Sequence, residues 1–147
     1  MSNNKNIYSV AILGAGRIGC GFDAPDSEQV LTHAHAFSQN PRTKLVALVD
    51  IDTAKGKQEA ERWGTTFYAS IEEMYAKEHP DIVVIATPDD THIDMLERIT
   101  ALRPKLIICE KPVIADPKNF GRAEALVGKV PTLVNFRRRF DPRVDEL

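Results

Sequence analysis

The sequence predicts an α/β protein with a doubly wound, mainly parallel sheet. Two observations support this: short β-branched runs alternate with longer stretches of helical period, and a glycine-rich turn follows the first run. Such alternation is typical of parallel strands joined by helices that cover both faces. The chain has 147 residues, 43% hydrophobic and 27% charged. That length and composition favour a single globular domain with one core.

Six short runs are expected to form the strands. Five of them are apolar and rich in β-branched residues, whereas the third along the chain is shorter and more polar, as an edge strand can be. In chain order they cover residues 7–13, 44–50, 66–69, 81–86, 106–110 and 132–135.

Two helices between these runs have clear start signals. Ser70, with Glu73 three residues later, fits a capping box that opens a helix ending before Pro80. Either Asp52 or Thr53 is expected to cap the helix after the second strand.

Two further helices follow the fourth and fifth strands. Thr91 is expected to start one that ends before Pro104. Asp116 supplies a cap and Pro117 a first helical position for another, which we expect to reach about residue 127.

The glycine-rich turn has the pattern G-x-G-x-x-G and comes directly after the first strand. In that context its first glycine makes a tight turn, its second lets the backbone approach a pyrophosphate, and its third lets the following helix pack on the strand. Amides at the helix N-terminus would hold the phosphates. The alternative is an ordinary glycine-rich turn. The expected cofactor contacts are Gly14, Ala15, Gly16, Arg17, Ile18 and Gly19.

An acid at the end of the second strand supports the same dinucleotide site. Asp50 is expected to accept hydrogen bonds from the adenine-ribose hydroxyls, which favours NAD because the 2′-phosphate of NADP would meet like charge. Asp50 lies 31 residues after Gly19, whereas the usual separation is about 20. A loop at residues 22–29 accounts for most of the excess. Asp52 is the competing acid, but its role as a helix cap is favoured.

Two more motifs complete a resemblance to a known family. The sequence T-P-D-D-T-H occupies residues 87–92, and E-K-P occupies residues 110–112. Together with the glycine turn, they make residues 7–140 resemble the glucose-fructose oxidoreductase, inositol dehydrogenase and MocA (Gfo/Idh/MocA) family. The resemblance implies a Rossmann fold, a nicotinamide cofactor, and hydride transfer to or from a sugar, a cyclitol or a nucleotide-linked sugar.

The resemblance also implies roles for residues that follow the fourth and fifth strands. Lys111 would be catalytic, shuttling the hydroxyl proton or hydrogen-bonding the oxygen; the alternative is an ordinary solvated lysine. Since a lysine with a pKa of about 10.4 is a poor base at neutral pH, its pocket must be enclosed or hold a nearby cation. Thr87 and Pro88 would lie under the cofactor. His92 would lie near the nicotinamide or be structural, and Glu110 would bind ribose or hold the turn.

Family members carry a second, large domain that shapes the substrate site, and this chain is expected to lack it. We assign residues 1–136 to the dinucleotide-binding domain and residues 137–147 to the start of a connection. The chain would then be a truncated piece, or a module working alone. We expect cofactor binding without efficient turnover. One alternative is a non-catalytic NAD(H)-responsive module that acts on a protein partner, and another is a site for S-adenosylmethionine.

Charge and cysteine content exclude several other classes. With 19 basic and 21 acidic side chains, a net charge of -2 gives no net attraction to nucleic acid or to an anionic membrane. Cys20 and Cys109 are far apart in sequence, which indicates reduced thiols in the cytoplasm. No metal site is expected, because His33 and His35 cannot share a helix face.

Two expectations concern the surface that a second domain would cover. The arginines at residues 137–139 would meet an acidic substrate or form a charged segment under that domain. Apolar surface left exposed at the docking face predicts a homo-oligomer.

Overall fold

The structure is a computed structural model that describes residues 6–136 and Asp141. Within this part of the chain, six parallel strands form one sheet in the order β3-β2-β1-β4-β5-β6. Their bounds are β1 Tyr8–Leu13, β2 Thr43–Val49, β3 Thr66–Tyr68, β4 Ile82–Ile85, β5 Leu106–Glu110 and β6 Thr132–Asn135.

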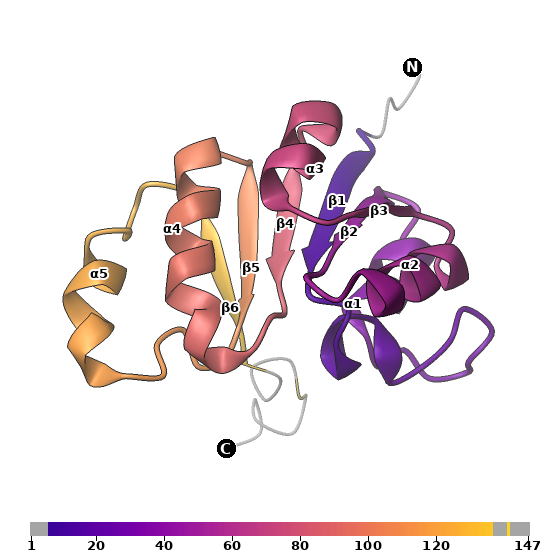
Figure 1. Ribbon diagram of the computed structural model, residues 1–147, viewed down its shortest axis with the longest axis horizontal. Helices are drawn as coiled ribbons and strands as arrows, with labels where there is room; N and C mark the ends of the chain where they lie inside the picture. Colours follow the sequence, from indigo (N-terminus) through magenta and orange to yellow (C-terminus); the bar gives the residue numbers. More distant parts are fainter. Residues whose placement is uncertain (1–5, 137–140, 142–147) are drawn as a thin grey trace.

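The strand order confirms the doubly wound fold. The central pair is β1 and β4, and the chain moves outward from it in both directions (Figure 1). The short polar strand β3 lies at one edge, as its sequence predicts. Because all strands run the same way, their carboxyl ends meet at one edge of the sheet, the lower one in Figure 1.

Helices cover both faces of the sheet (Figure 1). On one face lie α1 (His33–Gln39) and α2 (Thr53–Arg62), and on the other lie α3 (Ile71–Glu78) and α4 (His92–Leu102). A shorter helix, α5 (Phe120–Glu124), lies beside α4. None of the helices in the described residues has the length and apolar character needed to cross a bilayer.

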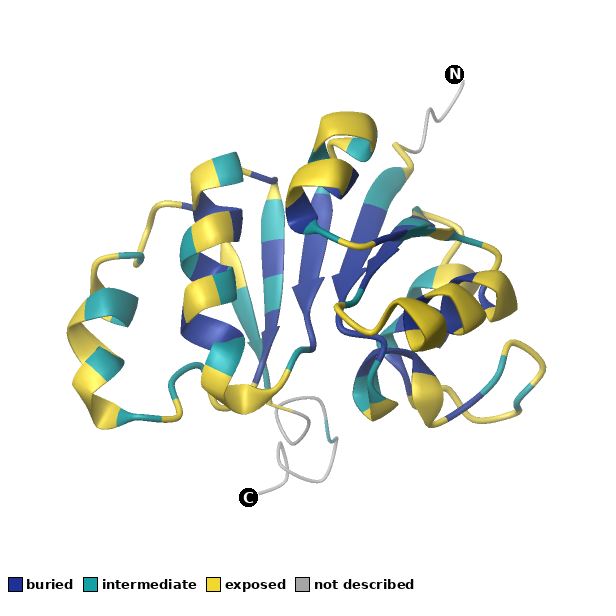
Figure 2. Cartoon of the chain, in the orientation of Figure 1, coloured by how far each residue is buried: buried dark blue, intermediate teal, exposed yellow. Residues whose placement is uncertain are grey.

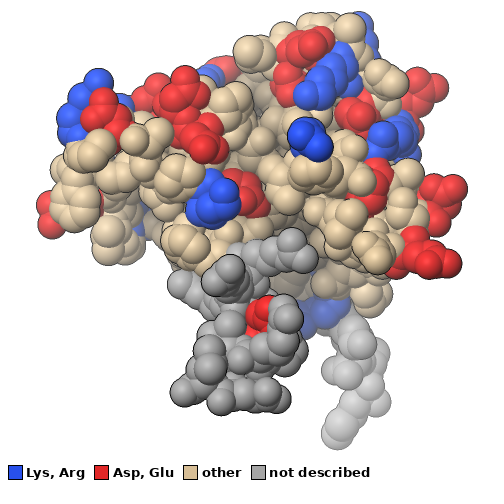
Figure 3. Space-filling view, turned by 90° about the horizontal axis from the view of Figure 1, so that it is seen from below, with Lys and Arg blue, Asp and Glu red and all other residues tan. Residues whose placement is uncertain are grey.

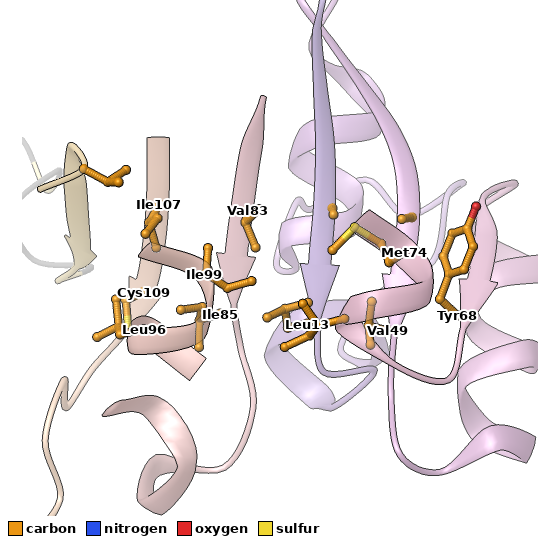
Figure 4. Packing of buried hydrophobic residues seen from close by; sticks show 14 residues of the cluster. Leu13, Val49, Tyr68, Met74, Val83, Ile85, Leu96, Ile99, Ile107 and Cys109 are labelled. Carbon is orange, nitrogen blue, oxygen red and sulfur yellow. The ribbon is translucent and has the colours of Figure 1, made fainter. Parts of the chain in front are cut away.

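The core consists of two apolar layers, one on each side of the sheet. Figure 4 shows the first, where Met74 of α3 and Leu96 of α4 pack on Leu13 and Ile85 of the central strands. In the second layer, Trp63 at the end of α2 packs over the opposite face. The central strands are therefore buried on both sides (Figure 2), which explains their continuous apolar runs.

The helix caps agree with the sequence at three places, one of which is Asp116, which accepts a hydrogen bond from the Lys118 amide at 3.0 Å. Ser70 caps α3 by accepting a hydrogen bond from the Glu73 amide at 3.1 Å. Asp52, rather than Thr53, caps α2 by accepting from the Lys55 amide at 3.1 Å. These side chains satisfy backbone donors that the first helical turn leaves unpaired.

A loop interrupts the first helix, as expected, and one later helix is shorter than predicted. The glycine turn leads into a single π-helical turn, Arg17–Gly21, and the following loop extends to Thr32 before α1 begins. The helix expected to reach residue 127 has a 3-10 turn, Pro117–Asn119, and an α-helix that ends at Glu124. None of the described residues of α5 is buried, so it lacks the packing that sustains longer helices.

A polar cluster joins the strands at the amino edge of the sheet. The Asp81 carboxylate accepts from the Ser9 amide at 3.0 Å and lies 2.7 Å from the Lys105 ammonium. The Lys105 side chain and the Ser9 hydrogen bonds hold the pKa of Asp81 below its ordinary value.

Replacing Asp81 with alanine leaves the partly buried Ser9 amide without its acceptor. We expect Asp81→Ala to lower the free energy of unfolding by about 1–3 kcal/mol. The control Glu72→Ala breaks an exposed ion pair with Arg98, and should cost less than about 0.5 kcal/mol. Urea denaturation followed by circular dichroism measures both, and equal losses would contradict this account of the cluster.

Candidate functional site

The predicted cofactor residues gather at the carboxyl edge of the sheet, where β1 and β4 lie side by side. In doubly wound sheets this point is where ligands bind. Figure 3 views this edge of the molecule, and acidic and basic side chains are interspersed over its visible surface.

The first glycine of the turn lies at a junction of three strands. The Gly14 amide donates to the Val49 carbonyl of β2 at 2.8 Å, and the Ala86 amide after β4 donates to the Leu13 carbonyl of β1 at 2.9 Å. Gly14 has a φ of 100°, and a Cβ on it would lie 2.5 Å from the Ala86 oxygen. Only glycine fits this position without moving β4.

The third glycine lies just as close to its own turn. A Cβ on Gly19 would lie 2.2 Å from the Gly14 carbonyl oxygen. The amides of Cys20 and Gly21 both donate to the Gly16 carbonyl, at 2.9 and 3.1 Å. The turn therefore closes on itself in a single compact loop against the end of β1.

The acid predicted to hold the ribose lies against this turn. The Asp50 Oδ2 atom accepts from the Ala15 amide at 2.6 Å, and its Oδ1 atom accepts from the Asp52 amide at 2.8 Å. Residues 35 positions apart in the sequence thus meet at the same edge. The next side chain, Ile51, is 97% exposed.

The two other side chains of the turn point to different environments. Ile18 packs against the apolar layer on the α1 and α2 face. Arg17 is exposed, and its guanidinium lies 4.7 Å from the centre of the Phe22 ring.

The turn after β4 is joined to the turn after β5 by a buried histidine. Thr87 is half-buried and Pro88 is exposed. His92 has no exposed surface; its Nε2 atom lies 2.9 Å from the Thr87 carbonyl and its Nδ1 atom 2.6 Å from the Pro112 carbonyl. The ring therefore lies beneath the two turns and links them.

The E-K-P segment pairs a buried acid with an exposed lysine. The Glu110 Oε1 atom lies 2.8 Å from His33 Nε2 and 2.6 Å from Asn135 Nδ2. Burial alone would raise the pKa of Glu110, but these hydrogen bonds hold the pKa below its ordinary value. Lys111 is exposed, and its bond to Pro112 is cis. The cis isomer is available to a bond that precedes proline at modest cost.

A second buried cluster was not predicted, and it anchors the loop after the glycine turn. The Asp23 carboxylate accepts from the Leu31 amide and the Thr32 hydroxyl, both at 2.5 Å, and lies 2.9 Å from His35 Nδ1. Burial opposes the charge on Asp23, but these hydrogen bonds keep its pKa below the ordinary value. Arg62 of α2 donates to the Asp23 carbonyl. The sequence offers no signal that singles out Asp23, because Asp26 and Glu28 lie in the same loop.

The described residues hold no cluster of three potential metal ligands, and their two cysteines are buried. Among residues 6–136 and Asp141, no three His, Cys, Asp or Glu side chains meet as metal ligands. Cys20 and Cys109 are buried and unlinked, and burial raises the pKa of each thiol to about 12. The arginines at residues 137–139, and all of the expected connection except Asp141, lie outside the described residues.

Known proteins share this fold and much of this sequence. The family model GFO_IDH_MocA, described as an oxidoreductase family with an NAD-binding Rossmann fold, matches residues 8–134. An inositol 2-dehydrogenase of Rhizobium meliloti is 38% identical over 133 residues, covering 89% of this chain and 36% of the relative. Another, from Renibacterium salmoninarum, is 33% identical over 136 residues, covering 90% and 38%.

A solved structure is similar to this chain in both fold and sequence. The crystal structure of a myo-inositol dehydrogenase from Corynebacterium glutamicum has a TM-score of 0.73 and 29% identity, covering 95% of this chain and 39% of that one. The chain therefore spans well under half the length of these relatives.

The junction at Gly14 should not accept a side chain. We expect Gly14→Ala to lower the free energy of unfolding by roughly 2–4 kcal/mol, because it adds both backbone strain and a clash with Ala86. Gly121 of α5 has open space around it, so Gly121→Ala should be neutral or stabilise by up to about 1 kcal/mol. Chemical denaturation of both variants tests this, and a Gly14→Ala protein as stable as wild type would refute the junction.

The charge on Glu110 should make the free energy of unfolding depend on pH. Because its folded-state pKa lies below its ordinary value, its contribution is present at neutral pH and is lost as the pH falls through the folded value. We expect wild type to lose more stability between about pH 5 and pH 3 than Glu110→Gln does. Glu61→Gln, on the exposed side of α2, serves as the control and should behave as wild type. If the free energy of unfolding falls equally with pH in Glu110→Gln and wild type, the stabilising role of the Glu110 charge is contradicted.

Proposed function

The chain belongs to the GFO_IDH_MocA oxidoreductase family, and we propose that it holds the NAD(H) of a dehydrogenase acting on a cyclitol, a sugar or a nucleotide-linked sugar. The observation that carries the proposal is the contact between the Ala15 amide and the Asp50 carboxylate, at 2.6 Å. It brings the two halves of a dinucleotide site together: a glycine turn for the pyrophosphate and an acid for the adenine ribose.

The residues present fit a dinucleotide. A Cβ would fill the tight space at Gly14, whereas at Gly16 the nearest atom to a Cβ is 3.9 Å away, so the backbone there is open to approach. The backbone amides of residues 16–19 would hold the pyrophosphate, because the amides of Gly14 and Ala15 already donate to the Val49 carbonyl and to Asp50. Thr87 and Pro88, at the neighbouring turn, would support the nicotinamide half.

NAD is favoured over NADP by the charges beside the ribose. Asp50 would repel a 2′-phosphate, and the two residues after it, Ile51 and Asp52, supply no positive charge. The first basic residue after Asp50 is Lys55, in the first turn of α2.

Lys111 is the residue we propose to be catalytic. The bound nicotinamide would supply or accept the hydride, and the Lys111 ammonium would hydrogen-bond the substrate oxygen or move its proton. Glu110 and His92 hold the backbone on either side of Lys111, so we assign them the role of orienting the Lys111 side chain. His92, with its ring fully buried between two carbonyls, would serve the cofactor through the turns it joins.

Charge removal at Asp50 should change the cofactor preference. We expect wild type to bind NADH at least about tenfold more tightly than NADPH, and Asp50→Asn to lose most of that preference. Asp52→Asn removes a charge two residues away but keeps a good helix cap, so its preference should stay unchanged. Fluorescence titration with both cofactors and with S-adenosylmethionine measures this. Tighter binding of S-adenosylmethionine, or equal behaviour of the two variants, would overturn the proposal.

A polypeptide of these 147 residues should bind NADH yet turn over little substrate. Lys111 is exposed, and an ammonium group in water gains little from neighbouring charges compared with one in an enclosed site. Incubation with NAD and myo-inositol, followed at the NADH absorbance band, tests this. Rapid dehydrogenation would show that the exposed lysine suffices.

A further inference from the structure

The acid that precedes the proposed catalytic lysine is held by side chains from two distant elements. His33, the first residue of α1, is 77 positions away in the sequence, and Asn135, the last residue of β6, is 25 positions away. Both contact the same Glu110 oxygen, and the side chains of His33 and Glu110 are only 11% and 12% exposed. The ends of β5 and β6 are thus tied to the start of α1 at the carboxyl edge.

Burial of the Glu110 carboxylate costs desolvation free energy. A strand-ending glutamate reaches water easily, whereas a buried carboxylate must be compensated by hydrogen bonds or charges. Here the compensation comes from His33 and Asn135, at 2.8 and 2.6 Å from the Glu110 Oε1 atom. Because Glu110 directly precedes Lys111, holding the Glu110 side chain also restrains the backbone from which the Lys111 side chain projects.

The other side of Lys111 is fixed as well. The carbonyl of Pro112 lies 2.6 Å from His92 Nδ1, beneath the turn. The residue before Lys111, Glu110, is thus held through its carboxylate by His33. The residue after it, Pro112, is held through its carbonyl by His92. The Lys111 side chain itself remains exposed at the edge where the cofactor residues gather.

The loop that follows the glycine turn determines where His33 lies. Thr32 caps α1 by accepting from the His35 amide at 3.1 Å, and the Thr32 hydroxyl donates to Asp23 at 2.5 Å. Asp23 is in turn tied to α2 through Arg62. The loop at residues 22–32 therefore sets the start of α1, and with it the position of the His33 ring.

We propose that His33 is a positioning residue for Lys111: through Glu110 it fixes the backbone that aims the lysine at the bound cofactor. The loop at residues 22–32 serves to place His33. This assignment rests on the proposed function for the role of Lys111, but the linkage itself is a property of the chain without cofactor.

Amide hydrogen exchange of the cofactor-free chain tests the linkage directly. His33→Ala removes the contact to Glu110, and His33→Asn keeps polarity but is too short to reach it, so either variant suffices if the other fails to fold. His33→Gln places an amide donor near the original Nε2 position. We expect the Lys111 amide to exchange about tenfold faster in the first two variants and near the wild-type rate in His33→Gln.

Matched controls separate this effect from a general loss of stability. His79→Asn replaces an exposed histidine in the left-handed conformation at the end of α3 with a residue that tolerates it. It should leave Lys111 exchange unchanged, and amides of β4 should exchange at wild-type rates in every variant. Equal exchange of Lys111 in His33→Ala and wild type, or failure of His33→Gln to restore it, would overturn the inference.

A second readout links the positioning to the cofactor. Acylation of the Lys111 amine, mapped by peptide mass spectrometry, should be slowed by NADH in wild type and His33→Gln, but much less in His33→Ala and His33→Asn at saturating NADH. Equal protection in all four proteins would overturn the positioning role. Failure of wild type to bind NADH would instead refute the proposed function, and the exchange result would still decide whether His33 acts on Lys111.

Discussion

The site depends on one steric constraint: the backbone of Gly14 must pass between the ends of β1, β2 and β4 with no room for a side chain. Its amide donates to the Val49 carbonyl, and the Ala86 carbonyl oxygen would lie only 2.5 Å from a Cβ at this position. Because this contact lies at the point where the chain reverses its direction across the sheet, it sets the positions of the glycine turn, Asp50 and the turn at Thr87. Each candidate cofactor residue after β1, β2 and β4 is thus placed by packing at one junction.

Local signals allowed most of this architecture to be predicted. The strands follow from short apolar runs, and the cap at Ser70 follows from a four-residue pattern. The glycine motif identified the Gly14 turn, and the separation between Gly19 and Asp50 revealed the intervening loop. Each of these features is encoded within a few consecutive residues, which is why a single sequence suffices.

Other features depend on contacts between distant segments, and the sequence did not reveal them. The length of α5 was overestimated because its cap is sound but its faces bury nothing among the described residues. The cluster at Asp23 and the link from His33 to Glu110 join residues whose proximity is decided only by the packed sheet. A structure reveals that a carboxylate is buried and that its desolvation must be compensated by hydrogen bonds. In a sequence the same residue is indistinguishable from a surface acid.

The central claim is that the Gly14 turn and Asp50 together form a dinucleotide site. A crystal structure of the chain soaked with NADH tests it most directly. We expect pyrophosphate oxygens at about 3 Å from backbone amides of residues 16–19 and ribose hydroxyls at about 3 Å from the Asp50 carboxylate. Density for NADH at any other place, or none beside the turn and Asp50 under saturating conditions, would contradict the account.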